Sequence, residues 1–490
     1  MSLSFRQFGM LAGPVAFACI ASFFRPEGLS GQGVAVLATT LWVAIWWITE
    51  AVPLAVTSLL PIVLFPLTGG LELSATTQAY GHRIVFLFMG GFVLSIAMER
   101  WGLHRRIALH IIYRMGTSMS GIVWGFMMAT GFLSMWISNS ATAVMMMPIA
   151  TAIIHQLSDD PATPENEQRL FGKALMLAVA YSASIGGMAT LIGTPPNLVL
   201  AGVVEELYGY ELTFNEWLAV GLPLSILLMV ACWWYLTRIA FPMQGQYLRS
   251  GKEEVGRQLR MLGRLTVEEK GVLIVFLLTA FAWITRSLVL KKILPAIDDT
   301  IIAIASAVCL FLLPAPNAAD KRLLNWESAV RLPWGVLLLF GGGLAIAAGF
   351  SESGLAQWIG AQFVALQHIP YLWLLLVIVL SVNFLTEITS NVATTSIMLP
   401  VLAPLAATVG VHPLGLMVGA TIAASCAFML PVATPPNAVV FGTGYLTIAD
   451  MAQVGVRMNL LSALIATLLV GLLLGWVWSI DLQHFPPNWR

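Results

Sequence analysis

Apolar segments long enough to cross a bilayer recur along almost the whole chain. A helix needs about 20 mostly apolar residues to span the roughly 30 Å hydrocarbon core of a membrane. Eleven segments are candidate crossings, and they lie near residues 8–24, 33–50, 53–68, 84–99, 172–204, 217–240, 271–290, 300–313, 334–350, 414–445 and 456–479. Because lipid cannot pair with backbone polar groups, long apolar spans have to be helical. The chain is therefore predicted to be an all-α polytopic membrane protein.

The composition agrees with this architecture. Of the 490 residues, 58% are hydrophobic and only 10% are charged. Soluble domains carry about 25% charged residues, so a surface this poor in charge has to face lipid. The formal net charge is zero, which gives no indication of a nucleic-acid partner. The cysteines lie singly in apolar stretches, without the spacing of a metal site; they are Cys19, Cys232, Cys309 and Cys426.

Two further apolar blocks are too long for one helix and are interrupted by polar residues at their middles. Residues 117–154 are interrupted at Ser138-Asn139-Ser140, and residues 371–409 at Ser390-Asn391-Val392. Non-helical backbone is tolerated at mid-membrane depth only where it is buried in protein or lines a wet cavity. We therefore expect each block to form a re-entrant helical hairpin whose tip reaches the middle of the membrane.

The basic residues predict the orientation of the chain, because cytoplasmic segments carry an excess of Lys and Arg. We take the run from Phe8 to Phe24 as the first transmembrane helix and place the N-terminus in the cytoplasm. The outside then keeps only six of the 24 basic residues: Arg25, Arg83, Arg286, Lys291, Lys292 and Arg490. This places the C-terminus outside. The polar stretch 241–270 becomes a cytoplasmic linker, which we expect to be a solvated loop.

The chain contains an internal duplication. At an offset of 252 residues, Gly90-Gly91 matches Gly342-Gly343 and Ser138-Asn139 matches Ser390-Asn391. At an offset of 240, Thr194-Pro195-Pro196-Asn197 matches Thr434-Pro435-Pro436-Asn437, and an extra polar loop near 155–170 accounts for the difference. The predicted orientation makes the two halves inverted copies. Inverted repeats with broken helices are typical of secondary transporters, and the breaks mark the binding site.

The residues at the breaks suit an anion together with a hard cation. Half-helix N-termini offer N–H donors and a positive dipole to an anion. Freed carbonyls and hydroxyls can coordinate sodium. Asparagine supplies both a donor and an acceptor, so Asn139 and Asn391 can each serve a carboxylate and a cation. Proline withholds its N–H, so the Thr-Pro-Pro-Asn segments are expected to be breaks as well.

Charge balance at these segments predicts sodium coupling. They hold no Lys or Arg, so bound cations would have to compensate the charge of a bound dianion. Proton coupling would need a titratable group, and Glu387 is the only acidic residue in either hairpin block. An intramembrane carboxylate is a functional candidate by default. We favour a structural role for Glu387, through hydrogen bonds within the second hairpin, over a role in proton coupling.

Three motifs resemble those of the divalent anion:sodium symporter family: Ile48-Thr49-Glu50-Ala51-Val52-Pro53, the two Ser-Asn hairpin tips and the paired Thr-Pro-Pro-Asn segments. The resemblance covers about residues 30–480. It implies a homodimer in which each protomer combines a scaffold domain with a transport domain that moves as an elevator. The family carries succinate, malate, fumarate, citrate or, in some branches, sulfate.

The resemblance also implies ligands, position by position. One sodium ion would be held by Ser134, Ser138, Asn139 and Gly193, and a second by Thr386, Thr389, Asn391 and Ala433, several of them through backbone carbonyls. The substrate would meet Ser138, Asn139, Ser140, Thr194, Ser390, Asn391, Val392, Thr434 and Pro435. The usual tip in the family is Ser-Asn-Thr. Ser140 is a conservative departure from it, whereas Val392 removes a hydroxyl, which bears on the choice of substrate.

The expected domains follow the repeat. Residues 1–116 would form scaffold helices and a first interfacial helix, and residues 117–240 the inner hairpin and broken helix of the transport domain. After the linker 241–270, residues 271–370 would form further scaffold helices and a second interfacial helix. Residues 371–490 would form the outer hairpin, the second broken helix and the last helix of the transport domain.

The expected function is sodium-coupled symport of C4 dicarboxylates across the cytoplasmic (inner) membrane. Its partners would be the dicarboxylate, sodium ions, membrane lipids and a second protomer. An exchanger of dicarboxylates or of tricarboxylates such as citrate is one alternative, and an anion channel lined by the hairpins is another. A membrane-embedded enzyme is disfavoured because the broken segments contain no acid–base pair or nucleophile arrangement.

Overall fold

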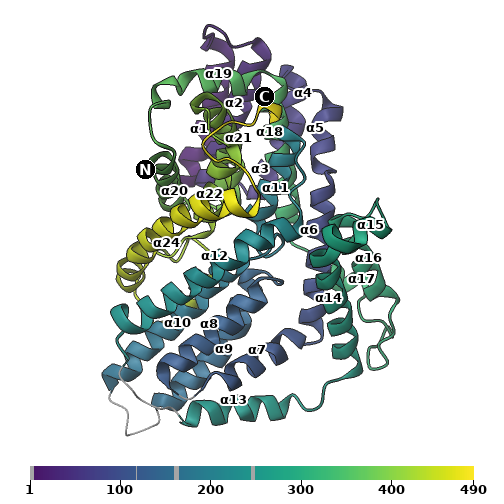
Figure 1. Cartoon of the computed structure of the whole chain (residues 1–490), viewed down its shortest axis with the longest axis vertical. Helices are drawn as coiled ribbons and strands as arrows, with labels where there is room; N and C mark the ends of the chain where they lie inside the picture. Colours follow the sequence, from purple (N-terminus) through teal and green to yellow (C-terminus); the bar gives the residue numbers. More distant parts are fainter. Residues whose placement is uncertain (1–4, 117, 159–164, 244–248, 490) are drawn as a thin grey trace.

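Helices make up all the regular structure (Figure 1). The structure, a computed structural model, describes residues 5–116, 118–158, 165–243 and 249–489. Within these ranges no strand occurs, and Pro314 and Arg322 form an isolated β-bridge. The expected all-α class is confirmed.

The helices of the first half run in the order α1 (Phe5–Phe23), α2 (Gly31–Thr49), α3 (Leu54–Thr57), α4 (Leu60–Thr68), α5 (Leu73–Tyr80), α6 (Arg83–Arg100), α7 (Leu103–Arg114), α8 (Met119–Ser134), α9 (Asn139–Ser158), α10 (Glu165–Gly187), α11 (Pro195–Tyr208), α12 (Phe214–Trp234), the π-helix η1 (Tyr235–Ala240) and α13 (Arg249–Met261). The second half continues with α14 (Val267–Thr285), the π-helix η2 (Arg286–Leu290), α15 (Lys291–Ile293), α16 (Asp299–Leu312), α17 (Trp326–Ala329), α18 (Trp334–Glu352), α19 (Leu355–Gln362), the 3₁₀-helix η3 (Val364–Leu366), α20 (Tyr371–Leu385), α21 (Asn391–Val409), α22 (Pro413–Ser425), α23 (Pro435–Phe441), α24 (Ile448–Val477) and the 3₁₀-helix η4 (Pro487–Trp489).

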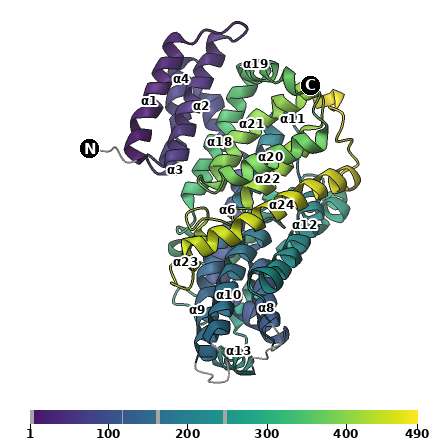
Figure 2. The same ribbon diagram turned by 90° about the vertical axis from the view of Figure 1, so that its left-hand side faces the viewer.

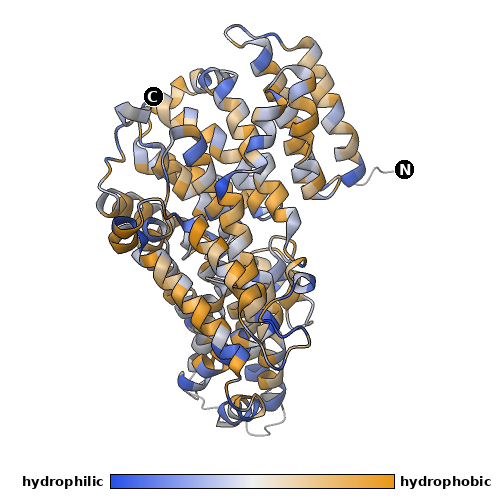
Figure 3. Cartoon of the chain, turned by 90° about the vertical axis from the view of Figure 1, so that its right-hand side faces the viewer, coloured by the Kyte–Doolittle hydropathy of each residue, from blue (hydrophilic) through white to orange (hydrophobic). Residues whose placement is uncertain are grey.

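The helical surface is built to face lipid. By length and composition, eight helical spans in the described part of the chain can cross a membrane: Gly31–Thr49, Leu73–Arg100, Glu165–Gly187, Phe214–Ala240, Val267–Ile293, Trp334–Glu352, Asn391–Val409 and Ile448–Val477. Large apolar side chains point outward from them, such as Phe281 on α14 and Leu472 on α24. Figure 3 shows apolar residues over most of the helical surface. Water would disfavour such continuous apolar faces, so the protein is an integral, multi-pass membrane protein.

The internal duplication reappears in the helix boundaries. At the offset of 252 residues, α6 and α18 end at corresponding positions, α7 and α19 begin at corresponding positions, and so do α9 and α21. At the offset of 240, α11 begins at Pro195 and α23 at Pro435. The spans expected at 172–204 and 414–445 are each interrupted before the two prolines, as predicted. The two halves of the sequence therefore fold into matching sets of helices.

The two hairpins lie in opposite halves of the molecule. α8 and α9 form the first hairpin in the lower half of Figures 1 and 2, whereas α20 and α21 form the second in the upper half. Each packs against its own broken helix, α8 and α9 against α10, and α20 and α21 against α22. α12 and α24, the long helices that follow the two breaks, pack against each other between them. The hairpins therefore approach the centre of the molecule from its two ends.

The remaining long helices form a second group beside the hairpins. α1 packs on α2, α2 on α4, and α14 on α16, which also packs along α6. α18 joins the two groups, because it contacts α2, α3 and α5 on one side and α11 and α21 on the other. The site between the hairpins therefore has one wall made by α18 and its neighbours.

Ion pairs mark the two ends of α6. Arg83, its first residue, pairs with Glu205 at 2.7 Å and with Asp298 at 3.4 Å. Arg100, its last residue, pairs with Asp320 at 3.2 Å. The sequence-based orientation assigned these two arginines to opposite faces of the membrane, and the structure separates them by the length of one membrane-spanning helix.

The linker 241–270 differs from the solvated loop that was expected. Residues 249–261 form α13, which packs against α7 and α9 at the lower end of Figure 1; residues 244–248 lie outside the described part of the chain. Val255 is buried, and Leu259 and Leu262 pack beside it. These residues recur at intervals of four and three positions, so one face of the charged stretch is apolar. That periodicity favours an amphipathic helix.

Candidate functional site

Both hairpins turn at a short non-helical segment that ends on a Ser-Asn pair. Asn139 is the first residue of α9, and Asn391 is the first residue of α21. Ser138 Oγ accepts the backbone N–H of Ala141 at 3.3 Å, as a serine before a helix commonly does. The first turn of a helix has unpaired N–H groups and the positive end of its dipole. α9 and α21 therefore direct donors and partial positive charge at the space between the tips.

The two broken helices interrupt at matching positions. Thr194 and Thr434 have extended backbones, with φ of −142° and −143°, and each is followed by two prolines that start a new helix. Proline at the first helical positions costs no hydrogen bond, because those N–H groups have no partner in the helix. The repeated Thr-Pro-Pro-Asn sequence therefore specifies a helix restart in each half.

One cavity of about 970 Å³ lies between the hairpin tips and the helix breaks. All nine residues predicted to contact the substrate line it: Ser138, Asn139, Ser140, Thr194, Ser390, Asn391, Val392, Thr434 and Pro435. The tip residues are half-buried, and Thr194 and Thr434 are almost completely buried. The fold thus brings together four segments that are widely separated in the sequence and presents hydroxyls, amides and helix N-termini to one space.

Behind the cavity wall, the hydroxyl of Ser134 faces more acceptors than it has protons. Its Oγ lies 2.7 Å from the carbonyl oxygen of Ala183 and within hydrogen-bond distance of Oδ1 of Asn139. A serine hydroxyl has one proton and can donate to only one acceptor at a time. A group of oxygen atoms with too few protons suits a hard cation, which binds lone pairs directly. Ser134 is fully buried and does not line the cavity.

Gly193 belongs to the same group of oxygens. A Cβ atom on Gly193 would collide with the carbonyl oxygen of Gly187 and would lie 3.0 Å from that of Ser134. A Cβ atom on Gly187 would lie 2.6 Å from Oδ1 of Asn139. Glycine is therefore required at both positions for the backbone to approach this closely. The structure brings together all four residues predicted for the first sodium site, since Ser138 and Asn139 are adjacent in the tip.

The second repeat reproduces the arrangement. Thr386 Oγ1 lies 2.7 Å from Oδ1 of Asn391 and 3.0 Å from the carbonyl oxygen of Ala424, and Thr386 is fully buried. Like Ser134, it has one proton for two acceptors. Thr389 and Ala433, the other residues predicted for the second sodium site, line the cavity next to Asn391. Each repeat therefore holds one hydroxyl, one asparagine amide oxygen and one carbonyl in the same relation.

The cavity wall also carries charged residues that inspection of the broken segments did not find. They are Arg6, Glu50, Glu99 and Arg331. Arg6 pairs with Glu50 at 3.3 Å, and both side chains are exposed to solvent. None of the four belongs to a hairpin or a break. The only sequence feature that could have indicated one of them as a site residue is the position of Glu50 in the Thr-Glu-Ala-Val-Pro motif. Both arginines belong to the set that was predicted to face the cytoplasm.

Glu50 has an unusual backbone. It ends α2 in the left-handed region, with φ of 46° and ψ of 40°. Residues with a side chain adopt this conformation at a cost, and such strain collects at functional sites. The turn places the Ala51–Pro53 segment against a second, smaller hollow that also contains Ser390 and Val392.

Glu387 has a structural role, but its partners differ from those that were predicted. Its carboxylate accepts the backbone N–H groups of Phe428 and Met429 on Oε1, at 2.7 and 3.0 Å, and that of Leu430 on Oε2 at 3.0 Å. Asn459 on α24 donates to Oε1 at 2.7 Å. The expectation of hydrogen bonds within the hairpin is therefore wrong. The side chain instead satisfies the donors of the unwound segment between α22 and α23, which have no helical partner there.

No group of three or more His, Cys, Asp and Glu side chains converges on a possible metal position in the described ranges. The oxygen atoms gathered behind the two tips are the hydroxyl, amide and carbonyl oxygens described above. Neutral oxygen ligands suit sodium rather than a transition metal.

Comparisons with known proteins agree with this geometry. The model of the sodium:sulfate symporter transmembrane region matches residues 6–481. The chain is 49% identical over 482 residues to the sodium-dependent dicarboxylate transporter SdcS of Staphylococcus saprophyticus, an alignment that covers 97% of this chain and 93% of the relative. It is 48% identical over 481 residues to SdcS of Staphylococcus aureus, with 97% and 92% covered.

A solved structure shares the fold. The YdaH transporter of Alcanivorax borkumensis superimposes with a TM-score of 0.58 at 14% identity, covering 82% of this chain and 87% of that one. At this identity the similarity concerns the fold alone. The family that the Ser-Asn tips and Thr-Pro-Pro-Asn segments indicated is confirmed by the full-length matches, and the chain belongs to the sodium:sulfate symporter family, the divalent anion:sodium symporters.

Proposed function

We propose that this protein is a sodium-coupled symporter of C4 dicarboxylates such as succinate, malate and fumarate. One observation carries the proposal: the hairpin tips and helix breaks of the two repeats meet in one cavity, with a proton-deficient oxygen cluster behind each tip. The relatives named above support both sodium as the coupling ion and a dicarboxylate as the substrate.

The cavity can hold a dianion without a basic side chain from the tips. The N-terminal turns of α9 and α21 would donate backbone N–H groups to the two carboxylates. Ser138 and Ser390 would add hydroxyl donors, and the amide groups of Asn139 and Asn391 would donate from opposite sides of the cavity. A substrate with two carboxylates fits a site with two equivalent anion-binding tips.

Each asparagine would also serve a cation. Oδ1 of Asn139 would bind the first sodium ion together with Ser134, Ser138 and Gly193. Oδ1 of Asn391 would bind the second together with Thr386, Thr389 and Ala433. Sodium would order the tips and neutralise charge near the substrate, so the substrate would bind well only after sodium. That order of binding couples the two fluxes.

Transport requires that the cavity open to both sides in turn. We assign α8–α12 and α20–α24 to a mobile transport domain, with α1–α6, α14, α16 and α18 as the scaffold, in an elevator mechanism. α7, α13 and α19 would connect them along the membrane surfaces. The cavity reaches Arg6 and Arg331, which the charge distribution places in the cytoplasm, so we assign the structure to the inward-facing state in the cytoplasmic membrane. A homodimer held through the scaffold completes the proposal.

Uptake of labelled succinate into proteoliposomes tests the proposal. With sodium outside and choline inside, we expect succinate to accumulate above the outside concentration. Two sodium ions balance the charge of one dianion, so an inward positive current would mean that at least one further sodium ion enters with each succinate. Equal uptake in sodium and choline would overturn the proposal.

Two controls separate the alternatives. An exchanger would take up label only when unlabelled dicarboxylate is inside the vesicles. A channel would show uptake that neither saturates with succinate nor exceeds equilibrium. Accumulation into empty vesicles that depends on the sodium gradient excludes both.

A further inference from the structure

Both breaks leave buried backbone carbonyls without a helical partner. The chain leaves the helical path between the end of α10 at Gly187 and the start of α11 at Pro195, so the carbonyls of this segment have no regular helical donor. The same holds between α22 and α23. At mid-membrane depth no bulk water is available to satisfy such groups, so another donor has to reach them.

In the first repeat the donor is Asn197, the last residue of the Thr-Pro-Pro-Asn motif. Its Nδ2 lies 2.7 Å from the carbonyl oxygen of Thr190 and 3.4 Å from those of Gly187 and Met188. Asn197 is the third residue of α11 and is fully buried. Side chains on a helix tilt toward its N-terminus, so an asparagine in the first turn points back into the break.

The second repeat repeats this contact. Nδ2 of Asn437 lies 3.0 Å from the carbonyl oxygen of Leu430 and 3.1 Å from that of Ala427, and Asn437 is fully buried. Leu430 and Ala427 correspond to Thr190 and Gly187 at the offset of 240. Because the side chains around the two breaks differ, the shared contact is a property of the break itself.

The carbonyls that Asn197 holds belong to the oxygen cluster behind the first tip. The carbonyl oxygen of Gly187 is the atom against which Gly193 packs so closely. Thr190 Oγ1 donates in turn to the carbonyl of Met135 in the hairpin turn, at 2.5 Å. A carbonyl has two lone pairs. That of Met188 also accepts Nε1 of Trp217 at 3.0 Å and that of Thr190 the backbone N–H of Gly193 at 3.3 Å, so the carbonyl of Gly187 is the one that can accept from Asn197 and face a cation with its other lone pair.

Neither asparagine lines the cavity, and the side-chain oxygen of neither accepts a hydrogen bond within the described part of the chain. Asn197 and Asn437 do not contribute to the cavity wall. Oδ1 of each is buried without a hydrogen-bond partner among the described residues. An unpaired buried acceptor is unfavourable, so the oxygen does not explain the choice of an amide here. The donor end is the part of the side chain that the structure uses.

We propose that Asn197 and Asn437 are positioning residues for the two sodium sites. Each amide fixes the unwound backbone so that its carbonyls face the ion, and neither contacts the ion or the substrate. The inference rests on the sodium coupling proposed above and adds to it two residues outside the predicted ligand set.

The test measures sodium binding without transport. Sodium-dependent thermal stabilisation of the purified protein, with choline as the comparison, gives a half-saturating concentration for each variant. We expect Asn197→Ala and Asn437→Ala each to raise that concentration about ten-fold, since each loses the two amide protons that set the geometry. At saturating sodium, succinate should bind with near wild-type affinity. A purely structural defect would weaken both sodium binding and succinate binding.

The isosteric variants Asn197→Asp and Asn437→Asp decide which end of the amide acts. At pH 8 a carboxylate cannot donate, so we expect sodium binding as weak as in the alanine variants. At pH 6 protonation of the new carboxyl would restore one donor, and sodium binding should recover in part. If the oxygen end bound the ion instead, aspartate would match or exceed wild type at pH 8. If the alanine variants fail to fold, the two aspartate variants are sufficient to test the inference.

A matched control removes a buried hydrogen bond nearby. Ser225 Oγ donates to the carbonyl of Ile185 on α10 at 2.8 Å, two residues before Gly187. Ser225→Ala should leave the sodium response unchanged. The inference would be overturned by wild-type sodium binding in all four asparagine variants, or by an equal loss of sodium binding in Ser225→Ala. In either case the proposed function would stand as long as the wild-type protein itself responds to sodium. Absence of a sodium response in the wild type would overturn both.

Discussion

Asn459 on α24 donates through Nδ2 to Oε1 of Glu387 at 2.7 Å, and this bond ties the last helix to the second hairpin. The same carboxylate accepts three backbone N–H groups of the unwound segment at Phe428–Leu430. Hydrogen bonds to a charged group are worth about 1.5–3 kcal/mol each. Glu387 is therefore the centre of a network that holds the second break in place.

Replacing this carboxylate should destabilise the unwound segment between α22 and α23, and the effect should grow with the number of acceptor oxygens removed. Glu387→Gln keeps one oxygen but turns its amide against a backbone N–H, so we expect a loss of about 1.5–3 kcal/mol in stability and weaker sodium binding. Glu387→Ala removes the acceptor of all four donors, of which only the N–H of Phe428 keeps a second acceptor in Oδ1 of Asn459, and it should abolish transport. Thermal unfolding and sodium-driven uptake measure both effects.

The exposed Glu352 at the end of α18 provides the matched control. Glu352→Gln makes the same chemical change outside any network and should behave as wild type. Wild-type stability and sodium dependence in Glu387→Gln would show that the network contributes nothing to the second site.

The tips and breaks were predictable because their polar residues and prolines differ from the apolar segments on either side. A Ser-Asn pair within an apolar block, or two successive prolines within an apolar span, cannot continue a buried helix unaided. The duplication then identified the two Ser-Asn sites as equivalent. Ser134 and Thr386 came only through the family resemblance, because a single hydroxyl residue in an apolar helix is usually bonded to its own backbone and has no local signature.

Other features depend on tertiary packing and could not be found from the sequence. The partners of Glu387 lie in another helix break and on α24, so no local pattern indicates them. Arg331 reaches the cavity from outside the motifs because of where α18 starts. The helix α13 is a different case: its apolar face was present at Val255 and Leu259, but the surrounding charge run concealed it.

A second prediction concerns the buried ion pairs at the first end of α6. Arg286 is 3% exposed, pairs with Asp299 at 3.0 Å and also pairs with Glu211, in the connection between α11 and α12. Arg286→Gln would leave Asp299 without its cationic partner and Glu211 with Arg83 alone, and we expect a loss of about 3–5 kcal/mol. Arg257→Gln, which removes a largely exposed partner of Glu254 on α13, should change stability far less, because solvent screens an exposed pair. Thermal unfolding of the two variants provides the comparison.

The acid response of Glu211 gives an independent check on this cluster. Burial by itself would raise the pKa of Glu211, but Arg286 and Arg83 outweigh burial and hold that pKa below its ordinary value. A lowered carboxyl pKa stabilises the fold above the ordinary pKa, and the contribution is lost as the pH falls through the lowered value. In Arg286→Gln the pKa of Glu211 should rise toward its ordinary value, so the loss of stability on acidification should be smaller than in wild type. If Arg286→Gln loses as much stability on acidification as wild type does, Arg286 does not lower the pKa of Glu211.

A third prediction concerns His412, which precedes α22 and lies against Trp489 in the C-terminal segment, with ring centroids 4.9 Å apart. Burial lowers the pKa of His412 to about 4, although the nearby Asp481 opposes this. The imidazole is therefore neutral in the folded protein at pH 7. Because the unfolded chain takes up its proton at about pH 6.5, stability should fall as the pH is lowered from about 6.5 toward 4.

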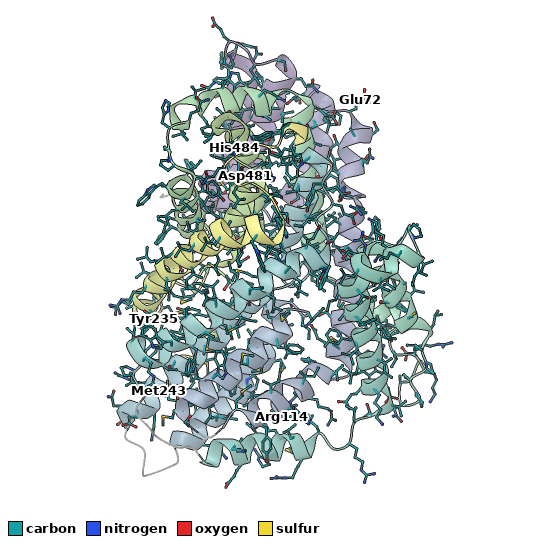
Figure 4. All side chains as sticks on the ribbon, viewed as in Figure 1. Glu72, Arg114, Tyr235, Met243, Asp481 and His484 are labelled. Carbon is teal, nitrogen blue, oxygen red and sulfur yellow. The ribbon has the colours of Figure 1, made fainter. Side chains whose placement is uncertain are left out.

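A pair of histidine variants isolates this effect. His412→Gln stays neutral at every pH, so the difference in unfolding temperature between pH 7 and pH 5 should shrink relative to wild type. His484, which is exposed and pairs with Asp481 in the same segment (Figure 4), is the control. His484→Gln should keep the wild-type pH dependence. The same loss of pH dependence in both variants would contradict the assignment to His412.

The last prediction uses the one tip position at which the two repeats differ in chemistry. Ser140 and Val392 occupy equivalent places after the asparagines, and both line the cavity. Valine and threonine have nearly the same size, so Val392→Thr adds a hydroxyl without a change in volume. One hydrogen bond is worth about 0.5–1.5 kcal/mol, which corresponds to roughly a 2- to 10-fold change in relative apparent affinity. Sodium coupling should be unchanged, because Val392 is not a proposed sodium ligand.

We expect the gain to favour short C4 dianions over citrate, because a small substrate depends more on each donor. Competition of labelled succinate by malate, citrate and sulfate, compared between Val392→Thr and the parent protein, measures the shift. Val144→Thr makes the same change one turn further along the first hairpin helix, at an exposed position outside the cavity, and should leave the competition profile as it is. If Val392→Thr also leaves the profile unchanged, Val392 does not face the bound anion, and the absence of a hydroxyl at the second tip has no part in substrate choice.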